Sequence, residues 1–178
     1  MGIVRMSMNY VETPDWAALF ASARKLDIYL AYGRTWRNNN LERLRKLALT
    51  ADARIRVYLP DPDDVPTIEW MAQRFGYTPT ALVDAIREAR AEYAGLQLGK
   101  GATVEIYRRT GEAMFSCYRF DGTAVLTLYS HSRTRQGIPT FVCRDGGQLY
   151  DFIRREFDAI ANQSHIVYPT SAATGGQP

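Results

Sequence analysis

Four consecutive polar residues in the second half of the chain carry groups that could bind or transform an anion. Ser130, His131, Ser132 and Arg133 supply two hydroxyls, an imidazole and a guanidinium. Hydroxyl groups combined with arginine form a typical set for holding a phosphate or a carboxylate. His131 could contact such a ligand or act as a general acid. The alternative is a structural histidine, hydrogen-bonded at the end of a strand.

A predicted hairpin delivers these residues. Residues 114–129 contain two strand-like runs on either side of a turn at Asp121-Gly122. Asp-Gly between apolar or aromatic residues is a strong hairpin signal, because the favoured turn needs positive φ at both central positions. Arg119 and Asp121 are two residues apart and therefore share a face if the strand reaches them. We expect them to form either a structural ion pair that supports the turn or a ligand clamp.

A second candidate site follows the first strand of a predicted βαβ unit over residues 27–60. Ligands of parallel α/β sheets bind outside the carboxyl ends of the strands. Tyr32, Arg34 and Trp36 lie at such an end. Arg34 could bind a phosphate while Tyr32 or Trp36 stacks on a base. The alternative is a packed aromatic side chain beside a surface arginine.

The carboxylates of Asp61, Asp63 and Asp64 suggest a metal site at first sight, but they directly precede a predicted helix. Aspartates there cap the free backbone N–H groups and are favoured by the helix dipole. His131 has no second histidine or cysteine at ligand spacing. We therefore expect no metal and no cofactor.

Composition limits the class of protein. The 178 residues, 46% of them hydrophobic, suffice for one domain with a core, and we divide the chain into an arm (1–14), a domain (15–167) and a disordered tail (168–178). No apolar run approaches the roughly 20 residues that span a membrane. Two cysteines are too few for a disulfide framework, so we expect buried thiols and a cytoplasmic location. A net charge of +3 with dispersed arginines disfavours a dedicated nucleic-acid binder.

The order of predicted elements indicates an α/β fold, in which helices flank a mixed β-sheet. Periodicity and turn signals divide the chain into elements. The predicted helices are 16–26, 38–48, 65–76, 78–98 and 148–162, and the predicted strands are 27–33, 54–60, 103–109, the two of the hairpin, and 140–143.

This order, together with the turn at Asp121, resembles one half of the phospholipase D-like fold. That family carries a His-x-Lys-x4-Asp signature, in which Asp121 takes the aspartate position. Met114 then stands at the position of the nucleophilic histidine and Ser116 at that of the phosphate-binding lysine. Methionine cannot form a phosphoenzyme, and serine carries no positive charge for a transferring phosphoryl group. The resemblance implies a scaffold without the catalytic groups of the family.

The chain is also similar to small uncharacterised bacterial domains that look like degenerate phospholipase D halves. These domains are attached to helix-turn-helix regulators or encoded near defence genes. The shared features are the segment 118–121, a histidine after the hairpin at His131, and Gly146-Gly147 before a final helix with phenylalanines at 152 and 157. The resemblance implies ligand sensing or regulation, and it transfers no catalytic residue.

We therefore expect a non-catalytic regulatory or sensor module that binds a phosphorylated or nucleotide-like ligand, or a protein partner. Its predicted contacts are Tyr32, Arg34, Trp36, Arg119, Asp121, Ser130, His131 and Arg133. Single phospholipase D-like halves pair about a two-fold axis, which implies a homodimer. One alternative is a phosphodiesterase or nuclease that uses His131. Another is an assembly protein in a bacterial defence or signalling complex.

Overall fold

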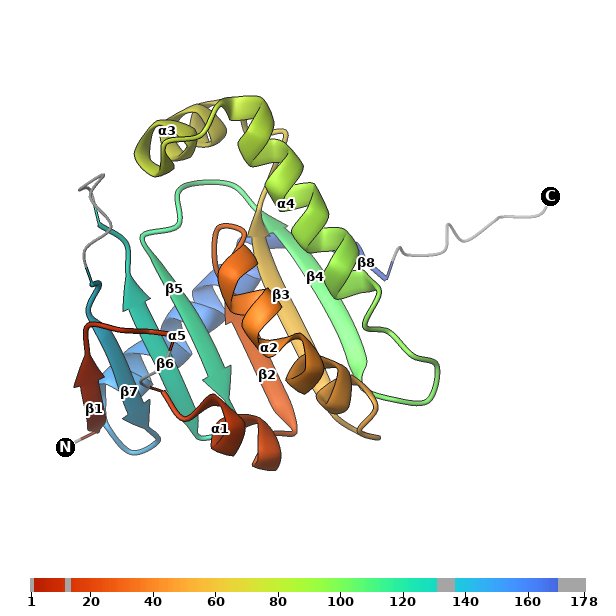
Figure 1. Ribbon diagram of the computed structural model, residues 1–178, viewed down its shortest axis with the longest axis vertical. Coiled ribbons are helices and arrows are strands. Elements are labelled where there is room, and N and C mark those ends of the chain that lie inside the picture. Colours follow the sequence, from red (N-terminus) through yellow and green to blue (C-terminus); the bar gives the residue numbers. More distant parts are fainter. Residues whose placement is uncertain (1, 12–13, 131–136, 170–178) are drawn as a thin grey trace.

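The computed structural model describes residues 2–11, 14–130 and 137–169. Within these residues, one eight-stranded sheet has the order β1-β7-β6-β5-β2-β3-β4-β8. Helices α1, α2 and α4 lie on one face of the sheet, and α5 crosses the other face (Figure 1). The predicted α/β class, a mixed sheet flanked by helices, is confirmed.

The elements follow the sequence order. The strands are β1 (Ile3–Ser7), β2 (Lys25–Tyr29), β3 (Arg54–Pro60), β4 (Thr103–Arg109), β5 (Phe115–Phe120), β6 (Thr123–Leu128), β7 (Thr140–Arg144) and β8 (Ser164–Tyr168). The helices are α1 (Trp16–Ser22), α2 (Arg34–Ala48), α3 (Val65–Phe75), α4 (Pro79–Ala94) and α5 (Gln148–Asn162). None of these helices is long and apolar enough to cross a membrane, as far as the described residues show.

Two local predictions about the sheet are confirmed. β2 pairs with β3 in parallel, as expected for the βαβ unit. β5 and β6 form the antiparallel hairpin, with Phe120 opposite Thr123. Of the two central positions of the turn, Asp121 has the expected positive φ, at 43°, and Gly122 does not. The buried residues of both strands of the hairpin pack into cores on the two faces of the sheet.

The structure corrects several element boundaries and adds a strand. α1 ends at Ser22 rather than at residue 26, because β2 already begins at Lys25, and α4 ends at Ala94 rather than at residue 98. The first predicted strand was placed at 27–33, but β2 ends at Tyr29. α2 begins at Arg34 rather than near residue 38, so the predicted loop before it is the first turn of the helix. β8, which the sequence did not predict, pairs with β4 at one edge of the sheet. β1, within the predicted arm, pairs with β7 at the other edge.

Successive residues of β5 belong to different cores, because side chains alternate across a strand. Tyr118 and Phe120 pack with the aromatic residues of α1 and α2. Cys117 packs under α5 with Cys143 of β7, and both thiols are free and buried, as predicted. This alternation decides which of the predicted site residues can meet.

Candidate functional site

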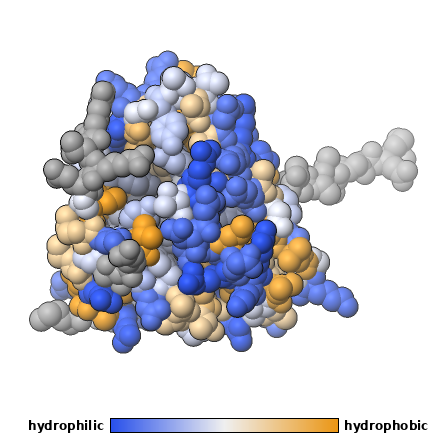
Figure 2. All heavy atoms as spheres, viewed as in Figure 1, coloured by the Kyte–Doolittle hydropathy of each residue, from blue (hydrophilic) through white to orange (hydrophobic). Residues whose placement is uncertain are grey.

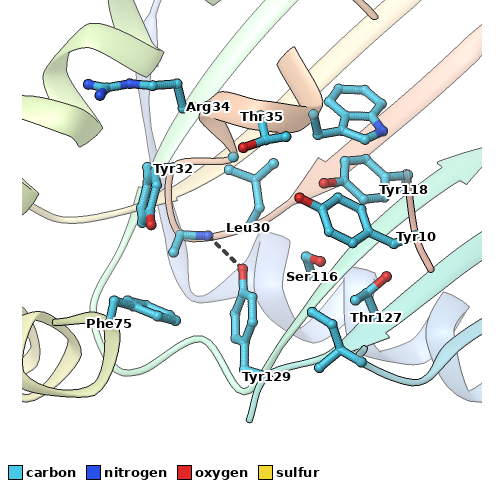
Figure 3. A pocket seen from close by; sticks show the side chains of 14 residues that line it. Tyr10, Leu30, Tyr32, Arg34, Thr35, Phe75, Ser116, Tyr118, Thr127 and Tyr129 are labelled. Carbon is cyan, nitrogen blue, oxygen red and sulfur yellow. Dashed lines mark hydrogen bonds between the residues drawn. The ribbon is translucent and has the colours of Figure 1, made fainter. Parts of the chain in front are cut away.

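A cavity of about 150 Å³ lies where β2 leads into α2. Its walls come from the arm, from residues 30–36, from α3, and from the β5–β6 hairpin (Figure 3). The lining residues include Tyr10, Leu30, Tyr32, Arg34, Thr35, Trp36, Phe75, Ser116, Tyr118, Thr127 and Tyr129. The predicted position outside the carboxyl end of a parallel strand is therefore hollow.

A sharp backbone turn joins the strand to the helix at this cavity. Gly33 precedes α2 in the left-handed region, at a φ of 56°, and a Cβ at this position would lie 2.7 Å from Cδ2 of Leu30. Both features favour glycine. Gly33 is the N-cap residue, and no side chain of the described residues caps the N-terminus of α2. The first N–H groups of a helix lack intrahelical partners and carry partial positive charge, so this end of the cavity favours an anion.

Hydroxyl groups from the hairpin form the opposite wall. Ser116 and Tyr118 of β5 and Thr127 of β6 line the cavity, and Ser116 lies opposite Thr127 in the register. The Tyr129 hydroxyl accepts a hydrogen bond from the Ala31 N–H at 3.1 Å, as Figure 3 shows. These hydroxyls can donate to an anion and carry no charge of their own.

Three tyrosines of the cavity wall, Tyr32, Tyr118 and Tyr129, are neutral. Burial raises the pKa of Tyr118 and of Tyr129 far above the usual value of a phenol, and a hydrogen bond with Ser116 offsets the shift only in part. Burial also raises the pKa of Tyr32, to which Tyr77 contributes through a hydrogen bond. Because these phenols stay protonated, they act as hydrogen-bonding groups and not as bases.

Arg34 provides a cation at the rim. Its guanidinium is half exposed and pairs with Glu88 of α4, with Nε 3.1 Å from the carboxylate. The hydrogen bond and charge of Glu88 raise the pKa of Arg34, which stays ionised. An exposed pair of this kind is weak, so an incoming anion can compete for the arginine.

Trp36 is a packed aromatic side chain, the second of the two roles that the sequence suggested, and not a ring free to stack on a base. Since it lies in the first turn of α2, its ring turns to the sheet and is 2% exposed. It stacks on Tyr118 with ring centroids 4.2 Å apart and meets Trp16 edge-on at 5.5 Å. The ring forms part of the core and of the cavity wall, and stacking on a base would require it to leave both. Its indole N–H is buried without a hydrogen-bond partner among the described residues.

Arg119 lies on the other face of the sheet from the cavity. Its Nε donates to Asp27 at 3.0 Å, and Nε of Arg56 donates to the same carboxylate at 2.7 Å. The Arg119 guanidinium also lies over the ring of Phe157, 4.9 Å from its centre. Burial raises the pKa of Asp27, but the hydrogen bond from Arg56 and the charge of Arg119 outweigh it and leave the pKa below its usual value.

Asp121 does not pair with Arg119, so the expected ion pair between these two residues is wrong. Its carboxylate accepts hydrogen bonds from the backbone N–H groups of Arg24 at 2.9 Å and Lys25 at 3.1 Å. Asp121 thereby ties the hairpin turn to the start of β2, at the end of β5 away from the cavity. The buried Asp27 is the partner that Arg119 takes instead.

The predicted residues 130–133 are placed only in part. Ser130 is exposed after β6. His131 and Arg133 lie outside the described residues, so their roles stay predictions. Of the two residues that the resemblance aligned with the signature histidine and lysine, Met114 is 71% exposed and does not line the cavity, whereas Ser116 is 6% exposed and does.

Several lining residues were not predicted from the sequence, among them the polar side chains of Tyr10, Thr127 and Tyr129. Thr127 and Tyr129 alternate along the second run of the hairpin, and Ser116 and Tyr118 along the first. That pattern indicates a shared face, but it does not say which face meets residues 30–36. No sequence pattern around Tyr10 predicts its place in the cavity wall. The strand before it, β1, is positioned by pairing with β7, which is distant in the chain. In the described part of the chain, no cluster of three potential metal ligands occurs.

No known protein family matches the sequence, and no curated protein is similar to it. Among solved structures, the chain is similar to TrmBL2, an archaeal chromatin protein described as showing a novel mode of DNA binding. That match has a TM-score of 0.45 and 10% identity, and it covers 83% of this chain and 48% of TrmBL2. The chain is also similar to Nuc from Salmonella typhimurium, a phospholipase D family member, with a TM-score of 0.43 and 9% identity over 84% of this chain and 88% of Nuc. This chain therefore spans about half the length of TrmBL2.

Proposed function

We propose that the protein is a non-catalytic regulatory or sensor module that binds a phosphorylated or nucleotide-like ligand in the cavity at the start of α2. The observation that carries this proposal is that two sets of hydrogen-bond donors, neither of which includes an ionised side chain, face each other across the cavity. The uncapped N-terminus of α2 forms one wall, and the hydroxyls of Ser116, Tyr118 and Thr127 form the other. Backbone N–H groups at a helix N-terminus are a common phosphate-binding element.

The size of the cavity indicates which part of the ligand enters. A cavity of about 150 Å³ holds one benzene-sized group, whereas sites for whole drug-sized ligands measure about 300–1,000 Å³. The cavity observed here, at about 150 Å³, suits a phosphoryl group. The remainder of the ligand would lie outside, over Arg34 and Tyr32 at the rim.

The chemistry of the lining supports binding over catalysis. A serine nucleophile needs an adjacent base, and the described groups around Ser116 are neutral phenols and hydroxyls. Met114, at the histidine position of the family signature, is exposed outside the cavity. The cavity thus has groups that hold an anion and none, among the described residues, that attack it.

Thermal unfolding with inorganic phosphate, nucleoside monophosphates and cyclic nucleotides tests the proposal. A ligand at about 100 times its dissociation constant adds about 2.7 kcal/mol, which raises the midpoint by a few degrees. We expect Ser116→Ala and Tyr118→Phe to reduce the shift. Tyr107→Phe is the matched control, since it removes a phenol hydroxyl that hydrogen-bonds Glu105 outside the cavity. A flat response at millimolar ligand, or equal shifts in all three variants, would refute the proposal.

The alternative that the sequence suggested is a phosphodiesterase or nuclease that uses His131. We expect the wild-type protein to cleave neither bis-p-nitrophenyl phosphate nor an oligonucleotide. Cleavage by the wild type that is lost in a folded His131→Ala variant would establish an enzyme and overturn the non-catalytic role. The same variant, measured by thermal shift, reports on the other predicted role of His131 in ligand contact.

The homodimer and the cytoplasmic location also stay proposals. β1 is an edge strand with exposed apolar side chains, of which Met6 is 60% and Val4 is 53% exposed. Edge strands of this kind readily pair with another chain, which supports self-association or a protein partner. Light scattering that gives a monomer at high concentration would contradict the dimer. The two free cysteines support a reducing compartment.

A further inference from the structure

The described arginines and lysines differ in whether they pair with a carboxylate. Most arginines pair with a carboxylate, among them Arg34 with Glu88 and Arg154 with Asp158. Several other cations do not, and one group of them lies on or beside α1 and α2. Among the described residues, Arg5, Arg24, Lys25, Arg43 and Lys46 form no ion pair with a carboxylate.

Two shallow hollows bring four of these cations together along α1 and α2. One hollow, of about 320 Å³, is lined by Arg24, Arg43 and Lys46 with Thr50 at its border. The other, of about 640 Å³, is lined by Arg5, Arg43 and the amides of Asn39 and Asn40. Both hollows share Arg43, so they form one continuous surface, which we call the α1–α2 basic surface. Figure 2 shows hydrophilic side chains gathered over α2 on this face.

The spacing on α2 produces a straight polar row. Asn39, Arg43 and Lys46 lie at positions i, i+4 and i+7 and therefore share one side of the helix. At a rise of about 1.5 Å per residue, the row is about 10 Å long. Since a DNA strand carries one phosphate per about 3.4 Å of helix axis, the row spans about three phosphates.

Local helix chemistry does not account for this row. Lys46 lies in the last turn of α2, where the helix dipole favours a cation, but Arg43 lies further from the end and Arg24 is on another element. On the same helix, Arg45 is paired with Glu42 at 2.6 Å. Neighbouring cations that stay unneutralised repel each other, and a polyanion would remove that repulsion.

The carboxylates near this surface are already engaged. Asp15, which lines the larger hollow, accepts a hydrogen bond from the backbone N–H of Ala18 at 2.9 Å. Asp121 accepts from the backbone N–H groups of Arg24 and Lys25. Neither aspartate forms an ion pair with a side chain of the basic surface in the described part of the chain. The guanidinium of Arg43 donates only to neutral oxygens, those of Asn39 and Asn40.

We propose that the α1–α2 basic surface binds the phosphodiester backbone of a nucleic acid. Arginine, lysine, asparagine and threonine side chains are the groups that contact phosphate oxygens in such interfaces. The aromatic residues of the hollows, Trp16 and Phe20, are buried and offer no exposed anchor for a lipid interface. This surface is separate from the cavity at the start of α2, so the inference does not depend on the proposed ligand.

The test measures fluorescence anisotropy of a labelled single-stranded oligonucleotide and of a duplex, between about 50 and 200 mM salt. We expect the wild type to bind with a dissociation constant of roughly 1–100 µM at physiological salt, and more tightly at low salt. Each phosphate neutralised on duplex DNA contributes about 0.9 to the salt slope. The triple variant Arg24→Gln/Arg43→Gln/Lys46→Gln should therefore lower the slope by about 2.7 and weaken binding by about tenfold or more.

A variant of equal charge controls for net charge. Arg87→Gln/Arg154→Gln/Arg155→Gln removes three exposed cations outside the basic surface, two of which pair with aspartates, and should retain the affinity of the wild type. Arg43 also donates hydrogen bonds to Asn39 and Asn40 within α2. If the triple variant unfolds for this reason, the double variant Arg24→Gln/Lys46→Gln replaces it in the test. Failure of the wild type to bind either oligonucleotide at low salt would overturn the proposal. So would equal losses in both triple variants, or binding to phosphatidylserine vesicles without binding to oligonucleotides.

Discussion

Ser116 of β5 lies directly opposite Thr127 of β6, and both buried hydroxyls line the cavity at the start of α2. The pair stands on the wall that faces the uncapped helix N-terminus. A neutral hydroxyl pair there can hold an anion without the positive charge that a transferring phosphoryl group requires.

Removing either hydroxyl should weaken binding of a phosphorylated ligand. A hydrogen bond to a charged group contributes about 1.5–3 kcal/mol, so Ser116→Ala or Thr127→Val should each raise the dissociation constant by about tenfold or more. Isothermal titration with the ligand found by thermal shift measures this change. Thr123→Val is the matched control, because Thr123 lies at the other end of β6 beside the hairpin turn. An unchanged affinity in the first two variants would exclude the hydroxyl wall as a binding element.

Asp27→Asn should strongly destabilise the fold. Asp27 is 2% exposed and accepts hydrogen bonds from both Arg56 and Arg119, which would keep their charges without a counterion. Breaking a buried ion pair by removing one partner costs about 3–5 kcal/mol. Urea unfolding should show this loss. Asp158→Asn, which breaks the exposed pair with Arg154, should cost about 0.5 kcal/mol or less.

The same carboxylate should make stability depend on acidity. The pKa of Asp27 lies below its ordinary value of 3.8 in the folded protein, so the folded state binds fewer protons there than the unfolded state. Its contribution is therefore complete above the unfolded pKa and is lost as the pH falls through the folded pKa. We expect the wild type to lose stability below about pH 4 more steeply than Asp27→Asn. Parallel curves of unfolding free energy against pH for the two proteins would contradict this.

Local signals in the sequence predicted much of the fold. The Asp-Gly turn predicts the β5–β6 hairpin, and an aspartate before α3 caps that helix as expected. Tyr32 and Arg34 follow β2, as expected for residues after the carboxyl end of a parallel strand, and their contact with a ligand stays a prediction. Both residues line the cavity.

Local signals of this kind do not predict contacts between distant parts of the chain. Arg119 was expected to pair with the nearby Asp121, yet its partner Asp27 is 92 residues away and becomes its neighbour only through the pairing of β2 with β5. The burial of Trp36 depends on where α2 begins, and Gly33 in the left-handed region sets that point. Ser116 and Thr127 gain a shared role only from the register of the hairpin and the helix opposite it.

Asp121 should prove to be a structural residue with no part in ligand binding. Its carboxylate accepts hydrogen bonds from two backbone N–H groups. Its φ of 43° is unfavourable for most residues other than asparagine, aspartate and glycine. Asp121→Ala loses both acceptors and retains the strained backbone, so it should cost about 2–4 kcal/mol. Asp121→Asn keeps one carbonyl acceptor and tolerates the backbone, so it should cost about half as much. Both variants should bind the ligand of the cavity like the wild type, as measured by titration below their unfolding temperatures. A folded Asp121→Asn variant that binds the ligand more weakly would contradict this prediction and support the ligand contact that the sequence suggested.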